Sequence, residues 1–175
     1  ASFASSDEPL DYDVVIYGGT AGGAIAAIAA AREGLKTALL EPRDHIGGMV
    51  SGGLGRTDHA NKTVIGGMSR EFFLRAGKHY GEPISWFFEP GVAERIYRDW
   101  LAEAKVEVLY RHRVETVTKS GRRIQNIRMD NGRVFTARIF MDCSYEGDLL
   151  PRAGITYTWG RESQDVYGES LAGRI

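Results

Sequence analysis

The sequence has only one cysteine, Cys143, and this scarcity excludes an intrachain disulfide. No apolar run approaches the roughly 20 residues that a membrane-spanning helix requires. Basic and acidic residues nearly balance, with a formal net charge of −1, so charge favours neither a nucleic acid nor a membrane as partner. The sequence has no His/Cys/Asp cluster with metal-ligand spacing, and we therefore expect no metal site. It also has no Ser/His/Asp arrangement that suggests a hydrolase.

Glycine, by contrast, is abundant and unevenly distributed. The 22 glycines gather at 18–23, 47–55 and 66–67. Glycine clusters of this kind indicate backbone that passes close to a ligand, because they leave room where a side chain would stand. The long glycine-rich passage after the first 40 or so residues has no periodicity, which is typical of a functional loop.

The first glycine cluster lies inside a strand–turn–helix–strand pattern. The β-branched run DVVIY at 13–17 predicts a parallel strand that is buried on both faces. The alanine-rich segment 22–33 predicts a helix that ends at Gly34, and KTALLE at 36–41 predicts a second strand. This order is a βαβ unit, for which we expect a right-handed crossover.

The rest of the chain predicts more helices and a set of antiparallel strands. Helical spacing occurs at 66–77 and at 90–104, where one apolar face consists of Val92, Ile96, Trp100 and Leu101. A strand is predicted at 106–110. The turns KSGR and DNGR then indicate an antiparallel meander that leads into a further buried strand, RIFMDC.

These patterns predict an α/β fold of the Rossmann-like, dinucleotide-binding class, with a parallel sheet and an antiparallel β-meander insertion. We expect a flexible leader at 1–10, the nucleotide-binding domain at 11–150, and a tail or the start of a substrate domain at 151–175. The first residues include no methionine and no apolar signal core. They leave two compartments open, the bacterial cytoplasm and, for a processed N-terminus, the periplasm or the exterior.

The segment GGTAGG at 18–23 matches the dinucleotide motif G-x-G-x-x-G at its first and third glycines, Gly18 and Gly23. Thr20 replaces the second glycine, and its hydroxyl can donate to a phosphate oxygen. Glu41 lies 18 residues after Gly23, where a carboxylate accepts from ribose hydroxyls. The alternative, a glycine turn that only packs a helix on a strand, does not account for this acid.

Several separated segments resemble one family of flavoproteins. After Glu41 the chain reads PRDHIGGMVSGGLGRTD, and VIGGMSREFF, FEPGVAERI and FMDCSYEGDLLPRAG follow. Together with YGGTAGG, they resemble the FAD-dependent oxidoreductases of the glutathione-reductase type. More narrowly, they look like a bacterial subfamily that is sometimes mislabelled xanthan lyase, in which threonine at the second glycine position is usual. The resemblance runs from about residue 12 to the last residue.

The resemblance implies FAD as cofactor and an FAD/NAD(P)-binding fold. It assigns the pyrophosphate to Gly18, Gly19, Thr20, Gly22 and Gly23, and the adenosine ribose to Glu41, Pro42 and Arg43. It places the phosphates and the flavin near Gly47, Gly48 and Met49. It matches Val114 to a backbone contact with adenine, and it sets Asp142, Cys143 and Ser144 beside the cofactor.

Catalytic groups are harder to assign, because the flavin ring carries most of the chemistry in such enzymes. Asp58 and His59, within GLGRTDHANK, are our candidates for moving a proton or anchoring a polar substrate. Arg56 and Lys62 lie in the same loop, and the alternative is a solvated loop without a special role. For Cys143 we expect a buried, inert thiol. The aromatic run 86–88 either packs in the core or faces a substrate.

The resemblance also implies that part of the family's fold lies outside these residues. Such proteins close the FAD domain with a later strand and a Gly-Asp motif, and Gly147-Asp148 comes too early for that role. We therefore expect the N-terminal portion of a longer flavoenzyme, or one half of a split one. A second chain or a C-terminal region would complete the site for a small-molecule substrate. An NAD(P)-binding module and a non-catalytic subunit are the alternatives.

Overall fold

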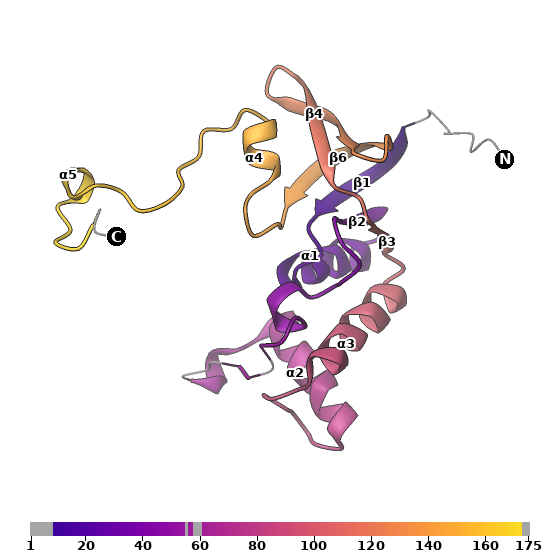
Figure 1. The fold of residues 1–175 in the computed structure, drawn as a ribbon. Helices are drawn as coiled ribbons and strands as arrows, with labels where there is room; N and C mark the ends of the chain where they lie inside the picture. Colours follow the sequence, from indigo (N-terminus) through magenta and orange to yellow (C-terminus); the bar gives the residue numbers. More distant parts are fainter. Residues whose placement is uncertain (1–8, 55, 58–60, 173–175) are drawn as a thin grey trace.

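A single six-stranded sheet forms the centre of the protein. The computed structural model describes residues 9–54, 56, 57 and 61–172. The sheet contains β1 (Leu10–Tyr17), β2 (Thr37–Glu41), β3 (Glu107–Tyr110), β4 (Val114–Ser120), β5 (Arg123–Met129) and β6 (Val134–Asp142). The strand order is β3-β2-β1-β6-β5-β4 (Figure 1). The predicted α/β class is confirmed.

The sheet is parallel in one part and antiparallel in the other. β3, β2, β1 and β6 run parallel, whereas β4, β5 and the start of β6 form the predicted antiparallel meander. β6 is longer than the predicted strand RIFMDC, because its first residues pair with β5 while its whole length runs beside β1. One strand therefore belongs to both parts of the sheet.

Three helices cover one face of the parallel strands. They are α1 (Ala21–Arg32), α2 (Gly67–Tyr80) and α3 (Pro90–Glu103). α1 packs on β1 and β2, α3 packs on α1 and β3, and α2 packs on α3. The helix α1 ends one residue earlier than predicted, and Gly34 follows it with a φ of 80°, as a residue that terminates a helix does.

The remaining elements are short. They are the 3₁₀ turns η1 (Gly48–Val50) and η2 (Lys62–Val64) and the single-turn helices α4 (Leu149–Arg152) and α5 (Gln164–Tyr167). The segment around α5 lies away from the sheet, and Trp159 before it is 88% exposed (Figure 1). None of the described helices has the length and apolar character needed to cross a membrane.

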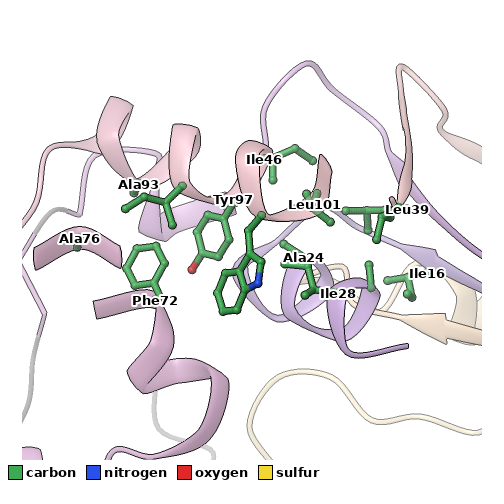
Figure 2. Packing of buried hydrophobic residues seen from close by; sticks show 14 of the residues in the cluster. Ile16, Ala24, Ile28, Leu39, Ile46, Phe72, Ala76, Ala93, Tyr97 and Leu101 are labelled. Carbon is green, nitrogen blue, oxygen red and sulfur yellow. The ribbon is translucent and has the colours of Figure 1, made fainter. Parts of the chain in front are cut away.

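The two faces of the sheet have separate apolar cores. On the helix face, side chains of β1 and β2 pack with Ala24 and Ile28 of α1, Phe72 of α2, and Tyr97 and Leu101 of α3 (Figure 2). On the other face, β1 and β2 pack with side chains of the meander and of α4. The predicted apolar face of α3 is buried, which confirms that prediction.

Trp100 of α3 joins the three helices. Its side chain is fully buried, and the guanidinium groups of Arg32 and Arg75 lie 5.2 and 4.5 Å from its ring centroid. Both arginines pair with Glu71 of α2, and Arg75 also pairs with Glu103 of α3. The charged groups thus cover an indole ring that belongs to the core.

We expect Trp100→Ala to lower the free energy of unfolding by about 3–5 kcal/mol, because it leaves a large cavity between the helices. Arg32→Ala removes one exposed ion pair and should cost only about 0–1 kcal/mol. Urea denaturation followed by circular dichroism measures both values. Equal effects of the two substitutions would contradict the central role of the indole.

Candidate cofactor-binding site

The predicted site residues meet at one edge of the sheet. β1, β2 and β6 are parallel, and Tyr17 at the end of β1 pairs with Leu40 on one side and Asp142 on the other. Their carboxyl ends are therefore level. Because β1 lies between strands reached in opposite directions, the crevice at its end is the position where open α/β sheets bind ligands.

Steric contacts explain the first and third glycines of the motif. Gly18 has a φ of 101°, and a Cβ atom there would lie 2.6 Å from the backbone nitrogen of Ser144. A Cβ atom on Gly23 would lie 2.0 Å from the carbonyl oxygen of Gly18. At Gly22, by contrast, the nearest atom would be 3.7 Å away, on Thr20. The turn and the helix can pack this closely only with glycine at 18 and 23.

Thr20 serves as the N-cap of α1. Its Oγ1 accepts a hydrogen bond from the Gly23 N–H at 3.1 Å and donates one to the Cys143 carbonyl oxygen at 2.9 Å. The hydroxyl proton is thus engaged by the end of β6 and does not point toward a ligand. The threonine keeps its place in the motif by capping the helix and tying it to β6.

The first turn of α1 offers donors for an anion. Gly23 N–H bonds to the Thr20 side chain, and Ala24 N–H bonds to the Thr20 carbonyl. Within the described part of the chain, no acceptor takes the N–H groups of Ala21 and Gly22. These two donors and the positive end of the helix dipole fit a pyrophosphate, and the space beside Gly22 leaves room for it.

Glu41 organises the neighbouring loop. The residue is 8% exposed, and its carboxylate accepts from Gly19 N–H and from Arg43 N–H, both at 2.7 Å. Its carbonyl oxygen accepts from His112 N–H, so the segment after β3 lies beside it. Each carboxylate oxygen has a second lone pair, which fits the ribose hydroxyls that the sequence predicts here. Pro42 lies between Glu41 and Arg43, which the hydrogen bond from Arg43 N–H joins.

The loop that contains Gly47, Gly48 and Met49 lies against the glycine turn. Gly47 N–H donates to the Gly19 carbonyl at 2.7 Å, and Met49 N–H donates to the Tyr145 hydroxyl at 2.7 Å. A Cβ atom on Gly48 would lie 2.2 Å from that hydroxyl. Tyr145 was not predicted from the sequence. Its position directly after the predicted run 142–144 is the signal that could have revealed it.

Asp142 and Ser144 use their side chains to fold the turn after β6. Asp142 accepts from the backbone and hydroxyl of Ser144 and from the N–H of Leu149, and Ser144 Oγ accepts from Asp148 N–H. Cys143 is half-buried, and this burial, with the charge of Asp142, raises the pKa of its thiol. A protonated thiol is a poor nucleophile, as expected for an inert cysteine.

Val114 lies in the core of the meander face, with 2% of its surface exposed. Its N–H donates to the Tyr17 hydroxyl at 3.3 Å. This amide is therefore not free to meet an adenine ring, and the adenine contact of Val114 stays a prediction.

The candidate catalytic residues Asp58 and His59 lie outside the described residues. In the same loop, Arg56 stacks on the ring of Phe87 and Lys62 stacks on Trp86. Of the aromatic run, Phe88 is buried against Phe72, whereas Phe87 is 51% exposed. The run thus serves partly as core. The described residues contain no group of three His, Cys, Asp or Glu that could hold a metal ion.

Comparison with known proteins identifies the family. A family model described as FAD dependent oxidoreductase matches residues 13–174. The chain belongs to the FAD-dependent oxidoreductase family. FAD is the family's cofactor, and the donors at the carboxyl edge of the sheet suit its pyrophosphate. No curated protein matches the sequence.

Several solved structures share the fold of this chain. L-proline dehydrogenase from P. horikoshii has a TM-score of 0.66 and 13% identity, covering 89% of this chain and 59% of its own. A geranylgeranyl bacteriochlorophyll reductase-like protein from Thermoplasma acidophilum has a TM-score of 0.64 and 21% identity, covering 89% of this chain and 45% of its own. A flavin-containing monooxygenase from Stenotrophomonas maltophilia has a TM-score of 0.54 and 19% identity, covering 89% of this chain and 43% of its own. The chain therefore spans less than two thirds of each.

We expect Gly23→Ala to lower the free energy of unfolding by about 1–3 kcal/mol, because its methyl group overlaps the Gly18 carbonyl. Gly22→Ala is the matched control, since its methyl group would meet only Thr20 Oγ1, at an ordinary contact distance of 3.7 Å, and alanine favours a helix. Guanidinium denaturation measures both. A Gly23→Ala protein as stable as Gly22→Ala would contradict the close packing of turn and helix.

Thr20→Val keeps the shape of the side chain and removes the cap, so it should cost about 1 kcal/mol of unfolding free energy. Thr20→Ser retains the hydroxyl and should cost less than Thr20→Val. The midpoints of thermal unfolding compare the two variants with the parent protein. If the valine and serine proteins unfold at the same temperature, the hydroxyl contributes nothing to α1.

Proposed function

We propose that the chain binds FAD at the carboxyl edge of β1, β2 and β6 and forms the nucleotide-binding part of a flavoenzyme. The observation that carries this proposal is the meeting of two unpaired helix N–H groups, of Ala21 and Gly22, with the carboxylate of Glu41 across one glycine turn. The two N–H groups suit a pyrophosphate and the Glu41 carboxylate suits a ribose, so together they match a dinucleotide.

Each residue has a defined part in this proposal. The N–H groups of Ala21 and Gly22 bind the pyrophosphate, and Glu41 holds the adenosine ribose. The backbone of Gly48 and Met49 lines the path toward the ring. When bound, the flavin supplies hydride transfer to or from a small molecule. Asp58 and His59 remain our candidates for moving the accompanying proton.

The substrate is an unidentified small molecule. The similar structures include, by name, a dehydrogenase of L-proline, a bacteriochlorophyll reductase-like protein and a monooxygenase. Their names cover different reactions on one fold, and a fold shared at low identity does not carry a substrate with it. The proposal therefore fixes the cofactor and the reaction type, oxidation or reduction, and leaves the substrate open.

We also propose that a further polypeptide segment completes the sheet beside β6. Residues 134–136 pair with β5, but no described strand pairs with the same edge of residues 137–142. Ile139 and Met141 pair with Val14 and Ile16, yet they are 54% and 37% exposed. The occupant we propose is a later segment of the same polypeptide, in keeping with the greater length of the similar chains.

A carboxylate placed at the pyrophosphate tests the cofactor proposal. Gly22→Asp introduces a negative charge at the N-terminus of α1. The charge favours the helix dipole there but repels a phosphate. We expect FAD affinity to fall at least about tenfold, while stability is kept. Gly22→Asn is the neutral control of the same shape and should bind FAD better than Gly22→Asp.

Binding is followed by quenching of flavin fluorescence and by absorbance bands at about 375 and about 450 nm. Equal FAD affinity in the Asp and Asn variants would place the pyrophosphate elsewhere. Binding of NAD(P) without FAD would favour the alternative, an NAD(P)-binding module. A protein that stays colourless with added FAD would contradict the proposal that this chain binds FAD.

A further inference from the structure

A row of three side chains lies under the loop that meets the glycine turn. His45 Nε2 is 2.8 Å from Ser51 Oγ, and His45 Nδ1 is 3.2 Å from Glu94 Oε2. His45 and Ser51 flank Gly47 in the sequence, whereas Glu94 comes from α3. The sequence did not reveal this row, because Glu94 is far from the other two along the chain.

The ring of His45 is held at both nitrogens. One nitrogen lies against the Ser51 hydroxyl, which donates its hydrogen to the Ile46 carbonyl oxygen at 2.5 Å, and the other lies against the Glu94 carboxylate. The imidazole therefore connects the loop to α3.

Glu94 is a carboxylate in this arrangement. Although burial alone would raise its pKa, the hydrogen bond from Arg98 and the charge of His45 lower the pKa of Glu94 below its ordinary value. Glu94 also accepts a hydrogen bond from the backbone of Ile46. The Glu94 carboxylate therefore contacts Arg98, His45 and the backbone of the loop.

The row has the shape of a Ser–His–acid triad, but it cannot act as one. Ser51 is 3% exposed, and its hydrogen goes to a carbonyl instead of to the histidine. A serine nucleophile needs the reverse, a hydroxyl that donates to its base and faces the substrate. The structure thus favours a positioning role over hydrolysis.

The object that these side chains position is the backbone at Ile46. Its N–H is bonded to Glu94 and its carbonyl to Ser51, so both of its backbone polar groups are held. The next residue, Gly47, donates to the Gly19 carbonyl within the glycine turn. A Cβ atom on Gly47 would lie 2.3 Å from Ser51 Oγ, which shows how closely the serine supports it.

We propose that His45, held between Glu94 and Ser51, is a positioning residue that fixes the Gly47–Gly48 turn against the glycine turn and so strengthens FAD binding. The proposal rests on the proposed function, since the turn matters only if the cofactor lies beside it. It follows that loss of the imidazole loosens this turn and weakens FAD binding.

Other charged and titratable groups surround His45 and hold the same loop. Asp44, on the same loop, is paired with Arg111 after β3. Arg98 of α3 donates to Glu94 and to the Asp44 carbonyl. Tyr97 of α3 lies against Gly47, and burial raises the pKa of its hydroxyl, so it stays neutral. Tyr145 bonds to the loop through Met49.

The first test observes the loop without cofactor. Amide hydrogen exchange of Gly47 should be faster in His45→Gln than in the parent protein, because the imidazole no longer connects Ser51 with Glu94. His79→Gln is the control, because His79 is exposed on α2. Unchanged exchange at Gly47 in His45→Gln would overturn the proposal.

The second test adds FAD and measures its dissociation constant for the parent protein, His45→Gln and His79→Gln. His45→Gln should bind FAD about tenfold more weakly than the parent protein, whereas His79→Gln should bind FAD as the parent protein does. The midpoint of thermal unfolding of His45→Gln should stay close to that of the parent protein. A loss of FAD affinity that comes with a large drop in this midpoint would be a merely structural effect, and that result would sink the proposal.

The two tests separate this inference from the proposed function. If the parent protein binds no FAD while its Gly47 amide is protected, the proposed function is wrong and the role in cofactor binding falls with it. If FAD binds with the same affinity to the parent protein and to His45→Gln, the proposed function stands and this inference is wrong.

Discussion

The contact between Gly23 and the carbonyl oxygen of Gly18 is the constraint on which the candidate site depends. It brings the first turn of α1 so close to the end of β1 that no side chain fits between them. The free N–H groups of the helix then point into the space above the sheet edge. Thr20 completes the arrangement, because one hydroxyl caps the helix and holds β6 beside it. Strand, helix and second strand are therefore joined at one place.

The loops of the site are built outward from this junction. Glu41 links the end of β2 to the glycine turn through Gly19, and Gly47 links the long loop to the same residue. Gly19 donates to one of them and accepts from the other, so a single residue sets the spacing of both. The row of His45, Ser51 and Glu94 extends this order to α3. The backbone of these loops is thus held by partners within the protein, whereas among the described residues the N–H groups of Ala21 and Gly22 have no acceptor.

Local patterns made the βαβ unit predictable, and long-range contacts account for what the sequence left out. The run DVVIY, the alanine-rich helix and the apolar face of α3 follow from periodicity and propensity, which act within a few residues. The hydroxyl of Thr20 illustrates the limit, because its acceptor is Cys143, more than a hundred residues away. Tyr145 and Glu94 were missed for the same reason, since their partners are distant in the sequence.

The position of β1 in the middle of the sheet sets the order in which the protein can assemble on the ribosome. β1 is made before the other strands of this sheet, and its neighbour β2 follows within about 20 residues, but β6 ends only at Asp142. At synthesis rates of about 5–20 residues per second, one edge of this apolar strand waits on the order of 10 seconds for its partner. During that interval the turn at Gly18 lacks the backbone of residues 142–144 that packs against it. The crevice at the end of β1 is therefore complete only after β6 has been made, long after the glycine motif at 18–23.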